Sequence, residues 1–153
     1  MAASGKIQID RYLRSGFRFF TPTPTRWGDC DMLGHINNVE YLRYYESGRL
    51  DYFHQLLGIS AGLEQVDSLI LADIHVTFLS QVHHPCALEV GTRIGRLGNS
   101  SFDIESAVFV PGEEQPASIA SATSVWFDYT RNRSRPIPQA ARETIQQFEG
   151  IES

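Results

Sequence analysis

Residues 26–58 of the chain read RWGDCDMLGHINNVEYLRYYESGRLDYFHQLLG. The second half of this stretch, from Val39 to Leu57, contains no proline, and Asn37 and Asn38 directly before it are good helix caps. Gly58 stands where a glycine commonly ends a helix, because glycine readily adopts a left-handed conformation. The stretch therefore predicts one long helix preceded by a polar loop.

This predicted helix is apolar around most of its circumference, which indicates burial on most sides. Gly48 in its interior costs about 1 kcal/mol of helix propensity relative to alanine. A close approach of a sheet or a partner chain would explain that cost, and so would simple tolerance. The apolar side chains are Val39, Tyr41, Leu42, Tyr44, Tyr45, Leu50, Tyr52, Phe53, Leu56 and Leu57.

Extended segments flank the helix on both sides. Before it, aromatic and β-branched residues from Phe17 to Trp27 favour a strand, and Pro22 and Pro24 indicate a sheet edge because proline cannot donate a ladder hydrogen bond. After it, turn signals such as Gly98-Asn99-Ser100 separate further β-rich runs, whose short connections indicate antiparallel pairing. The four runs are Leu69 to Leu79, Cys86 to Leu97, Phe102 to Val110 and Ala117 to Tyr129.

The order of these elements predicts an α+β domain in which one sheet covers one central helix. Residues 138–149 predict a short C-terminal helix, with Pro138 suited to its first turn. The chain has 153 residues and no internal repeat or Ser/Gly linker, so we expect a single domain.

The composition excludes several classes of function. A net charge of −5 disfavours a protein that binds nucleic acid through phosphate contacts. No stretch approaches the roughly 20 apolar residues that span a bilayer, and the N-terminus has no apolar signal segment. The two cysteines, Cys30 and Cys86, require no disulfide in a chain with this much core, so we expect a cytoplasmic protein.

The loop before the helix holds the densest group of chemically useful residues. It contains Asp29, Asp31 and His35, followed by Asn37 and Asn38. A helix start offers unpaired N–H groups and a partial positive charge, which stabilise an anion that develops on a carbonyl oxygen. A nearby carboxylate is able to activate water or to attack the carbonyl itself. The loop is therefore suited to acyl transfer to water, although the same residues also suit a braced loop with ordinary caps.

The stretch from Asp29 to Leu42 resembles the signature of hotdog-fold acyl-CoA thioesterases in the 4-hydroxybenzoyl-CoA thioesterase superfamily. Gly-His-x-Asn-Asn before the helix is most similar to the long-chain acyl-CoA branch. The likeness extends over roughly residues 17–138 and includes the order of the elements. It implies a single hotdog domain, with a five-stranded antiparallel sheet wrapped around the helix.

The resemblance assigns roles to individual residues. Asp31 is implied to be the catalytic carboxylate, as a nucleophile or as a general base on water. The backbone N–H of Asn38 is implied to face the thioester oxygen. His35 is implied to lie near the site, where it either takes part in catalysis by orienting water or the carboxylate or is a structural loop histidine. Asn37 is implied to cap the helix or to position the substrate. The region that is implied to hold the CoA phosphates contains Arg96, Asn99, Ser100 and Ser101, although a solvated hairpin carries the same residues.

The resemblance also implies a reaction without metal or cofactor and self-association as a homodimer or homotetramer, with acyl-CoA as the substrate. Met32-Leu33-Gly34 stands where the aromatic-CoA branch has Pro-x-Gly, which puts a hydroxybenzoyl substrate in doubt. A thioester of acyl carrier protein is an alternative, because plant thioesterases of that class share Asp-x-x-x-His-x-Asn-Asn. A non-catalytic module that binds or senses acyl-CoA is another, and enoyl hydration is a minor one.

Two further groups of residues are weaker candidates. His75, His83 and His84 have no cysteine or carboxylate at a metal-ligand spacing and are expected to lie in loops or at the surface. Arg131, Arg133 and Arg135 form a positive cluster that could attract an anionic group, but a solvated tail after the last strand is the preferred interpretation.

Overall fold

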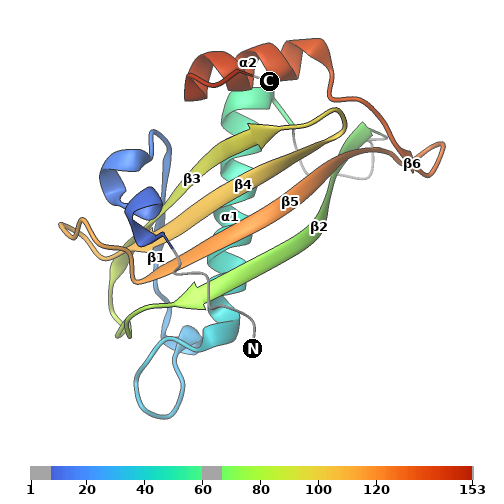
Figure 1. Cartoon of the computed structure of the whole chain (residues 1–153). Coiled ribbons are helices and arrows are strands. Elements are labelled where there is room, and N and C mark those ends of the chain that lie inside the picture. The colour runs from blue at the N-terminus through green and yellow to red at the C-terminus, as the bar shows by residue number, and fades with distance from the viewer. Residues whose placement is uncertain (1–7, 60–66, 153) are drawn as a thin grey trace, which may run out of the picture.

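The computed structural model describes residues 8–59 and 67–152, with the backbone alone described at positions 67 and 68. Its main feature is one antiparallel sheet with the strand order β1-β3-β4-β5-β2 (Figure 1). The strands are β1 (Phe20–Pro24), β2 (Asp67–Phe78), β3 (Ala87–Leu97), β4 (Ser101–Phe109) and β5 (Ser118–Asp128). A short strand β6 (Arg133–Ser134) pairs with the end of β5. Arg133 and Ser134 therefore extend the sheet, so this segment is not a free tail after the last strand, although residues 129–134 are exposed as predicted.

The helix α1 (Asn38–Leu57) lies against one face of the sheet. A second helix, α2 (Gln139–Glu149), lies beside the C-terminal end of α1 (Figure 1). The predicted α+β architecture, a five-stranded antiparallel sheet wrapped around one long helix, is confirmed, with the two-residue strand β6 added at the end of β5. Pro138 serves as the N-cap of α2 and not as a residue of its first turn. Three short 3-10 helices complete the described part: Ile9–Tyr12, Arg14–Gly16 and Trp27–Asp29.

The predicted edge strand is shorter than the sequence pattern suggested. Residues 14–16 and 27–29 form 3-10 turns, so β1 covers five residues and pairs with β3 alone. The edge position that Pro22 and Pro24 indicated is confirmed. The second edge is β2, which pairs with β5 and not with the next strand in sequence, β3.

The ends of α1 follow the sequence pattern. The side chain of Asn37 accepts a hydrogen bond from the N–H of Val39 at 3.2 Å, and Gly58 ends the helix in a left-handed conformation with φ 66°. A Cβ atom on Gly48 would lie 2.8 Å from Cγ1 of Val90, so the close approach of a sheet explains this glycine. The helix is not buried on most sides, because Val39, Leu42 and Leu50 on one flank are exposed.

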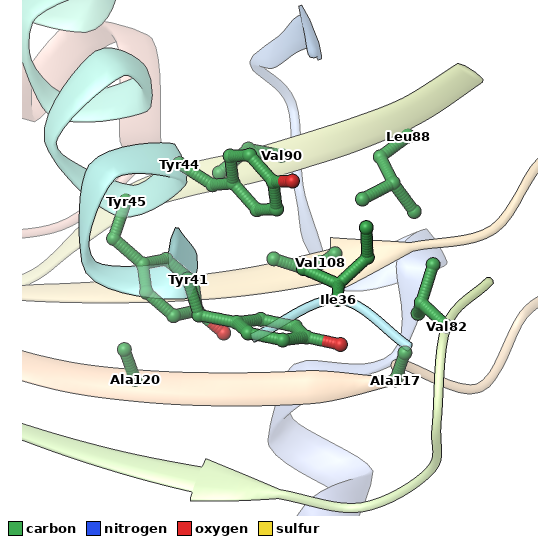
Figure 2. Packing of buried hydrophobic residues seen from close by; sticks show 10 residues of the cluster. All are labelled: Ile36, Tyr41, Tyr44, Tyr45, Val82, Leu88, Val90, Val108, Ala117 and Ala120. Carbon is green, nitrogen blue, oxygen red and sulfur yellow. The ribbon is translucent and has the colours of Figure 1, made fainter. Parts of the chain in front are cut away.

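Two apolar clusters fix α1 on the sheet. The first surrounds its N-terminal half and includes Tyr41, Tyr44 and Tyr45 together with side chains of β3, β4 and β5 (Figure 2). The second surrounds its C-terminal end, where Tyr52 and Phe53 pack with residues of β3, β4 and α2. The first cluster also holds the loop that precedes the helix.

Candidate active site

The loop between β1 and α1 turns sharply at Asp31. The N–H of Asp31 donates to the carbonyl of His35 at 2.8 Å, and the N–H of Gly34 donates to the carbonyl of Asp31 at 3.2 Å. Gly34 has φ 79°, a left-handed conformation that side chains disfavour. The side chain of Asp31 completes the turn, because its Oδ1 accepts the N–H groups of Leu33 (2.8 Å) and His35 (3.1 Å). No residue of the described part donates to Oδ2 of Asp31, which is exposed.

Asp29, two residues earlier, has a different role. Its carboxylate is buried and accepts hydrogen bonds from the backbone N–H of Arg26 (2.9 Å), the Arg26 guanidinium and the hydroxyl of Tyr44 (2.7 Å). Burial alone would raise the pKa of Asp29, but these hydrogen bonds outweigh it and lower that pKa below its ordinary value. Burial and the bond to Asp29 raise the pKa of Tyr44. Asp29 thus braces the loop against the helix, whereas Asp31 faces solvent.

The first turn of α1 presents one backbone donor without an acceptor. The N–H of Val39 is taken by the Asn37 side chain, and the N–H of Glu40 by the Asn37 carbonyl at 2.9 Å. The N–H of Asn37 donates to the carbonyl of Asp29 at 2.9 Å. Asn38 is exposed, and its N–H reaches no acceptor among the residues described. At a helix start this group combines an open hydrogen bond with the positive end of the helix dipole.

The segment between β2 and β3 lies against this loop. The N–H of Ile36 donates to the carbonyl of Val82 at 2.9 Å, and both side chains are buried in the first apolar cluster (Figure 2). The rings of His35 and His83 meet edge to face, with centroids 4.5 Å apart. The pairing of His83 with His35 is not readable from the sequence, since the two residues come from separate loops.

A cavity of about 310 Å³ opens where these segments meet. Tyr41 and Phe78 form an aromatic wall, with ring centroids 5.2 Å apart. The sequence patterns did not indicate that residues 78–81, at and after the end of β2, line this cavity. Their place beside Asp31 depends on the folding of the whole sheet. The lining residues are Asp31, His35, Ile36, Asn38, Tyr41, Phe78, Leu79, Ser80 and Gln81.

The predicted phosphate contacts lie at the other end of the molecule. Arg96 pairs with Asp103, with Nε and Oδ2 2.8 Å apart. Asn99 and Ser100 form the turn between β3 and β4, where the carbonyl of Asn99 accepts the N–H of Ile137, and Ser101 begins β4. This turn packs beside the C-terminal end of α1, and a helix of 20 residues is about 30 Å long. Within one chain, Asp31, His35 and Asn38 therefore come together, but the four candidate phosphate ligands do not join them.

The other histidines and the cysteines take local roles. His84 Nδ1 lies 2.8 Å from the hydroxyl of Thr25, and His75 is exposed on β2. Cys30 and Cys86 are free thiols. Among the described residues no group of three or more histidines, cysteines and carboxylates is arranged to hold a metal ion. None of the helices in this part of the chain has the length and apolar character that a membrane span requires.

With this geometry in hand, the chain can be compared with known proteins. Residues 25–145 match the family model described as the thioesterase-like superfamily. A candidate thioesterase of Pseudomonas aeruginosa is 33% identical and superimposes with a TM-score of 0.76, covering 82% of this chain and 96% of that one. A Thermus thermophilus thioesterase, solved in complex with coenzyme A and Zn, is 28% identical with a TM-score of 0.76, covering 90% and 98% of the two chains.

Curated relatives include the chloroplastic acyl-acyl carrier protein thioesterase ATL2 of Arabidopsis thaliana. It is 26% identical over 125 residues, which cover 79% of this chain and 64% of the relative. The chain spans between 60% and 64% of the length of the curated relatives it matches.

Proposed function

The chain belongs to the thioesterase-like superfamily, and on that premise we propose that it hydrolyses an acyl-CoA thioester to the free carboxylic acid and CoA. The observation that carries this proposal is the shared cavity of about 310 Å³, which is lined by both Asp31 and Asn38. Asp31 supplies a carboxylate, and Asn38 supplies a backbone N–H group with no acceptor among the described residues. The two groups together suit hydrolysis of a thioester, whereas simple binding of the same ligand needs no carboxylate beside the carbonyl.

The N–H of Asn38 is the oxyanion donor in this proposal. As water or a carboxylate adds to the thioester carbonyl, negative charge collects on the carbonyl oxygen. A fixed N–H at the positive end of a helix dipole stabilises that charge without any reorganisation. What supports the assignment is that every other N–H from Asn37 to Glu40 already has an acceptor within the chain.

Asp31 is the catalytic carboxylate. As a general base it takes a proton from a water molecule, whose oxygen attacks the carbonyl carbon; the tetrahedral intermediate then collapses and expels the CoA thiolate, which is protonated. As a nucleophile it forms an acyl anhydride through Oδ2 and expels the thiolate, and water then hydrolyses the anhydride. A single turnover in ¹⁸O-labelled water distinguishes direct attack by water, which labels the product acid, from an anhydride that water opens at the aspartyl carbonyl, which labels Asp31 and leaves the first product acid unlabelled.

His35 and Asn37 position these groups. The backbone N–H of His35 holds Oδ1 of Asp31, which leaves Oδ2 to face the substrate. The side chain of Asn37 occupies the N–H of Val39, so the oxygen of the substrate has one defined donor at the helix start. Both contacts fix the geometry of the reacting groups, as precise catalysis requires.

The thioester carrier has two candidates. A Thermus thermophilus relative was solved with coenzyme A, which favours a CoA thioester. The Arabidopsis relatives are named as acyl-acyl carrier protein thioesterases, which makes a carrier-protein thioester the second candidate.

Self-association is part of the proposal. In the described part of the chain, the outer edge of β2 pairs with no other strand, although β2 is twelve residues long. A long open edge is a template for pairing with another chain. Exposed apolar side chains, Leu71 and Phe78 on the strand and Leu79 directly after it, accompany this edge. We therefore propose that two copies join along β2, close to the cavity that Phe78 lines.

The test is a thiol-release assay with purified protein. The substrates are acyl-CoAs from acetyl to palmitoyl, phenylacetyl-CoA, benzoyl-CoA and the matching thioesters of acyl carrier protein. The proposal expects turnover of CoA thioesters, with a maximum at one acyl class. Turnover of carrier-protein thioesters alone would favour the second candidate. A folded protein that binds acyl-CoA but releases no thiol from any substrate would overturn the proposal in favour of a binding module.

A further inference from the structure

Arg49 is a buried arginine in the middle of α1. The residue is only 8% exposed, although arginine is a residue type that mostly stays at the surface. Among the described residues, its guanidinium makes no ion pair and no hydrogen bond. Burial lowers the pKa of Arg49, and the charge of Glu46, one turn earlier, only partly opposes this effect. A guanidinium keeps its proton at neutral pH, so its burial costs free energy unless an acceptor lies against it.

The side of α1 that carries Arg49 faces the β2 edge of the sheet. Successive helical residues are turned by about 100°, so Leu42 and Arg49 point about 180° and 200° away from Asp51. Oδ2 of Asp51 accepts the hydroxyl of Thr21 on β1 at 2.7 Å, so this opposite side of α1 faces β1. Strands β1 and β2 are the two edges of the five-stranded path (Figure 1). The Arg49 side is therefore turned toward the open edge of β2.

Four residues form a line along this side of α1, at the helical spacing i, i+4, i+7 and i+11. We call this line the charged stripe, and its members are Leu42, Glu46, Arg49 and Phe53. Leu42 and Glu46 are exposed, and so is Leu50 beside the stripe. Glu46 makes no ion pair or hydrogen bond within the described part of the chain. The stripe thus carries one negative and one positive group, neither of which has a contact partner there.

The charged stripe is complementary to a second copy of itself. In two antiparallel helices related by a two-fold axis, each residue lies opposite the one equally far beyond the axis, and every contact occurs twice. An axis between positions 47 and 48 sets Glu46 opposite Arg49 and Leu42 opposite Phe53. We propose that Glu46 of a second copy pairs with Arg49, and that this reciprocal pair of contacts joins two copies of the chain. This inference rests on the pairing of copies that forms part of the proposed function.

Two observations favour a second copy as the source of this carboxylate. Glu46 of the same chain is only one turn away, yet it does not contact the guanidinium of Arg49. The stripe also faces the same side as the exposed apolar residues Leu71, Phe78 and Leu79, so one interface covers all of them. Oppositely charged groups that an interface removes from water fix the register of two partners and suppress wrong pairings.

The first test reverses one charge at a time and measures association by sedimentation. Glu46→Arg and Arg49→Glu each set like charges opposite each other at both contacts of the dimer. We expect the Kd of the dimer to rise about 100-fold or more in each variant. Arg43→Glu is the matched control, because it makes the same charge change on α1 at a residue that is 70% exposed and points about 120° away from Arg49. In the control we expect a change of less than about threefold.

The second test mixes the two single variants, which carry different affinity tags. In a mixed dimer the native Arg49 lies opposite the native Glu46, and the introduced arginine lies opposite the introduced glutamate. We expect the Kd of the mixed dimer to return to within about tenfold of the wild-type value. If Glu46 and Arg49 instead paired within one chain, or if Arg49 had another partner, the mixture would associate no better than its parents, and the inference would be overturned.

Two further measurements complete the design. If Arg49→Glu does not fold alone, it is co-expressed with Glu46→Arg: recovery of a soluble mixed dimer supports the inference, and no recovery overturns it. Thiol release is measured separately on the wild-type protein. A wild-type chain that stays monomeric would overturn the inference whatever its activity, whereas a dimer with the expected mixing pattern that hydrolyses no thioester would refute the proposed function alone.

Discussion

Replacement of Asn38 by proline should remove the proposed oxyanion donor and leave the fold intact. Asn38 is the first residue of α1, a position where proline is favoured because its N–H has no partner within the helix. Asn37 before it has φ −63° and ψ 137°, an extended conformation that a following proline requires. The substitution therefore changes one hydrogen-bond donor in the cavity and keeps the backbone path.

The size of the effect follows from the charge that the N–H stabilises. Loss of one oxyanion donor costs about 10²- to 10³-fold in kcat, or about 3 kcal/mol of transition-state stabilisation. The free energy of unfolding should change by less than about 1 kcal/mol, because no hydrogen bond within the described chain is lost. Asn38→Ala is the control, since it removes the side chain and keeps the N–H.

The assay compares kcat in thiol release with urea unfolding for wild type, Asn38→Pro and Asn38→Ala. We expect low kcat in the proline variant alone, with similar unfolding curves for all three proteins. A folded proline variant with wild-type kcat would refute the assignment of this N–H. A large loss of kcat in Asn38→Ala would move the role to the side chain.

Three substitutions test the packing and the buried charges that hold the site. Tyr44→Phe should lower the free energy of unfolding by about 2 kcal/mol, because it removes the hydroxyl bound to the buried Asp29 carboxylate. The lowered pKa of Asp29 stabilises the fold above about pH 4, so this loss should shrink as the pH falls through that range; a loss independent of pH would contradict the assignment. Gly48→Ala should lower the free energy of unfolding in urea by about 1 kcal/mol, because the cost of overpacking against Val90 exceeds the gain in helix propensity. A variant more stable than the wild type would contradict the close contact between Gly48 and Val90. Burial raises the pKa of Glu149, so ionisation of this carboxyl weakens the fold as the pH rises above about 4.5. Glu149→Gln should therefore raise Tm at pH 8 but not at pH 4. Equal Tm shifts at both pH values would refute this reasoning.

The local features of the fold were predictable from sequence because their causes are local. Asn37 caps the helix with its own side chain, and Gly58 ends it with its own φ. The edge position of β1 also follows from residues within the strand, since Pro22 and Pro24 have no N–H to donate.

Features that depend on distant contacts were not predictable. Nothing in β2 or β3 indicates that β2 pairs with β5, because the partner of a strand is decided by the packing of the whole sheet. The exposed flank of α1 is another example, since apolar side chains on all sides of a helix do not reveal which side meets the sheet.

The candidate site, like the fold, has features with local causes that the sequence indicated and features that depend on distant contacts. The motif around Asp29 and Asp31 indicated a site, but the burial of one carboxylate depends on Tyr44, which lies fifteen residues further on. Similarly, the edge-to-face contact between His35 and His83 joins two loops that are far apart in sequence.

The central claim is that the Asp31 carboxylate carries out thioester hydrolysis, and the most direct test is thiol release by Asp31→Asn. The amide keeps the shape and can still accept the N–H groups of Leu33 and His35, so the fold and the affinity for acyl-CoA should be retained. We expect kcat to fall by at least about 10³-fold with an almost unchanged Kd for CoA. A folded Asp31→Asn protein that hydrolyses the preferred substrate at the wild-type rate would contradict the account.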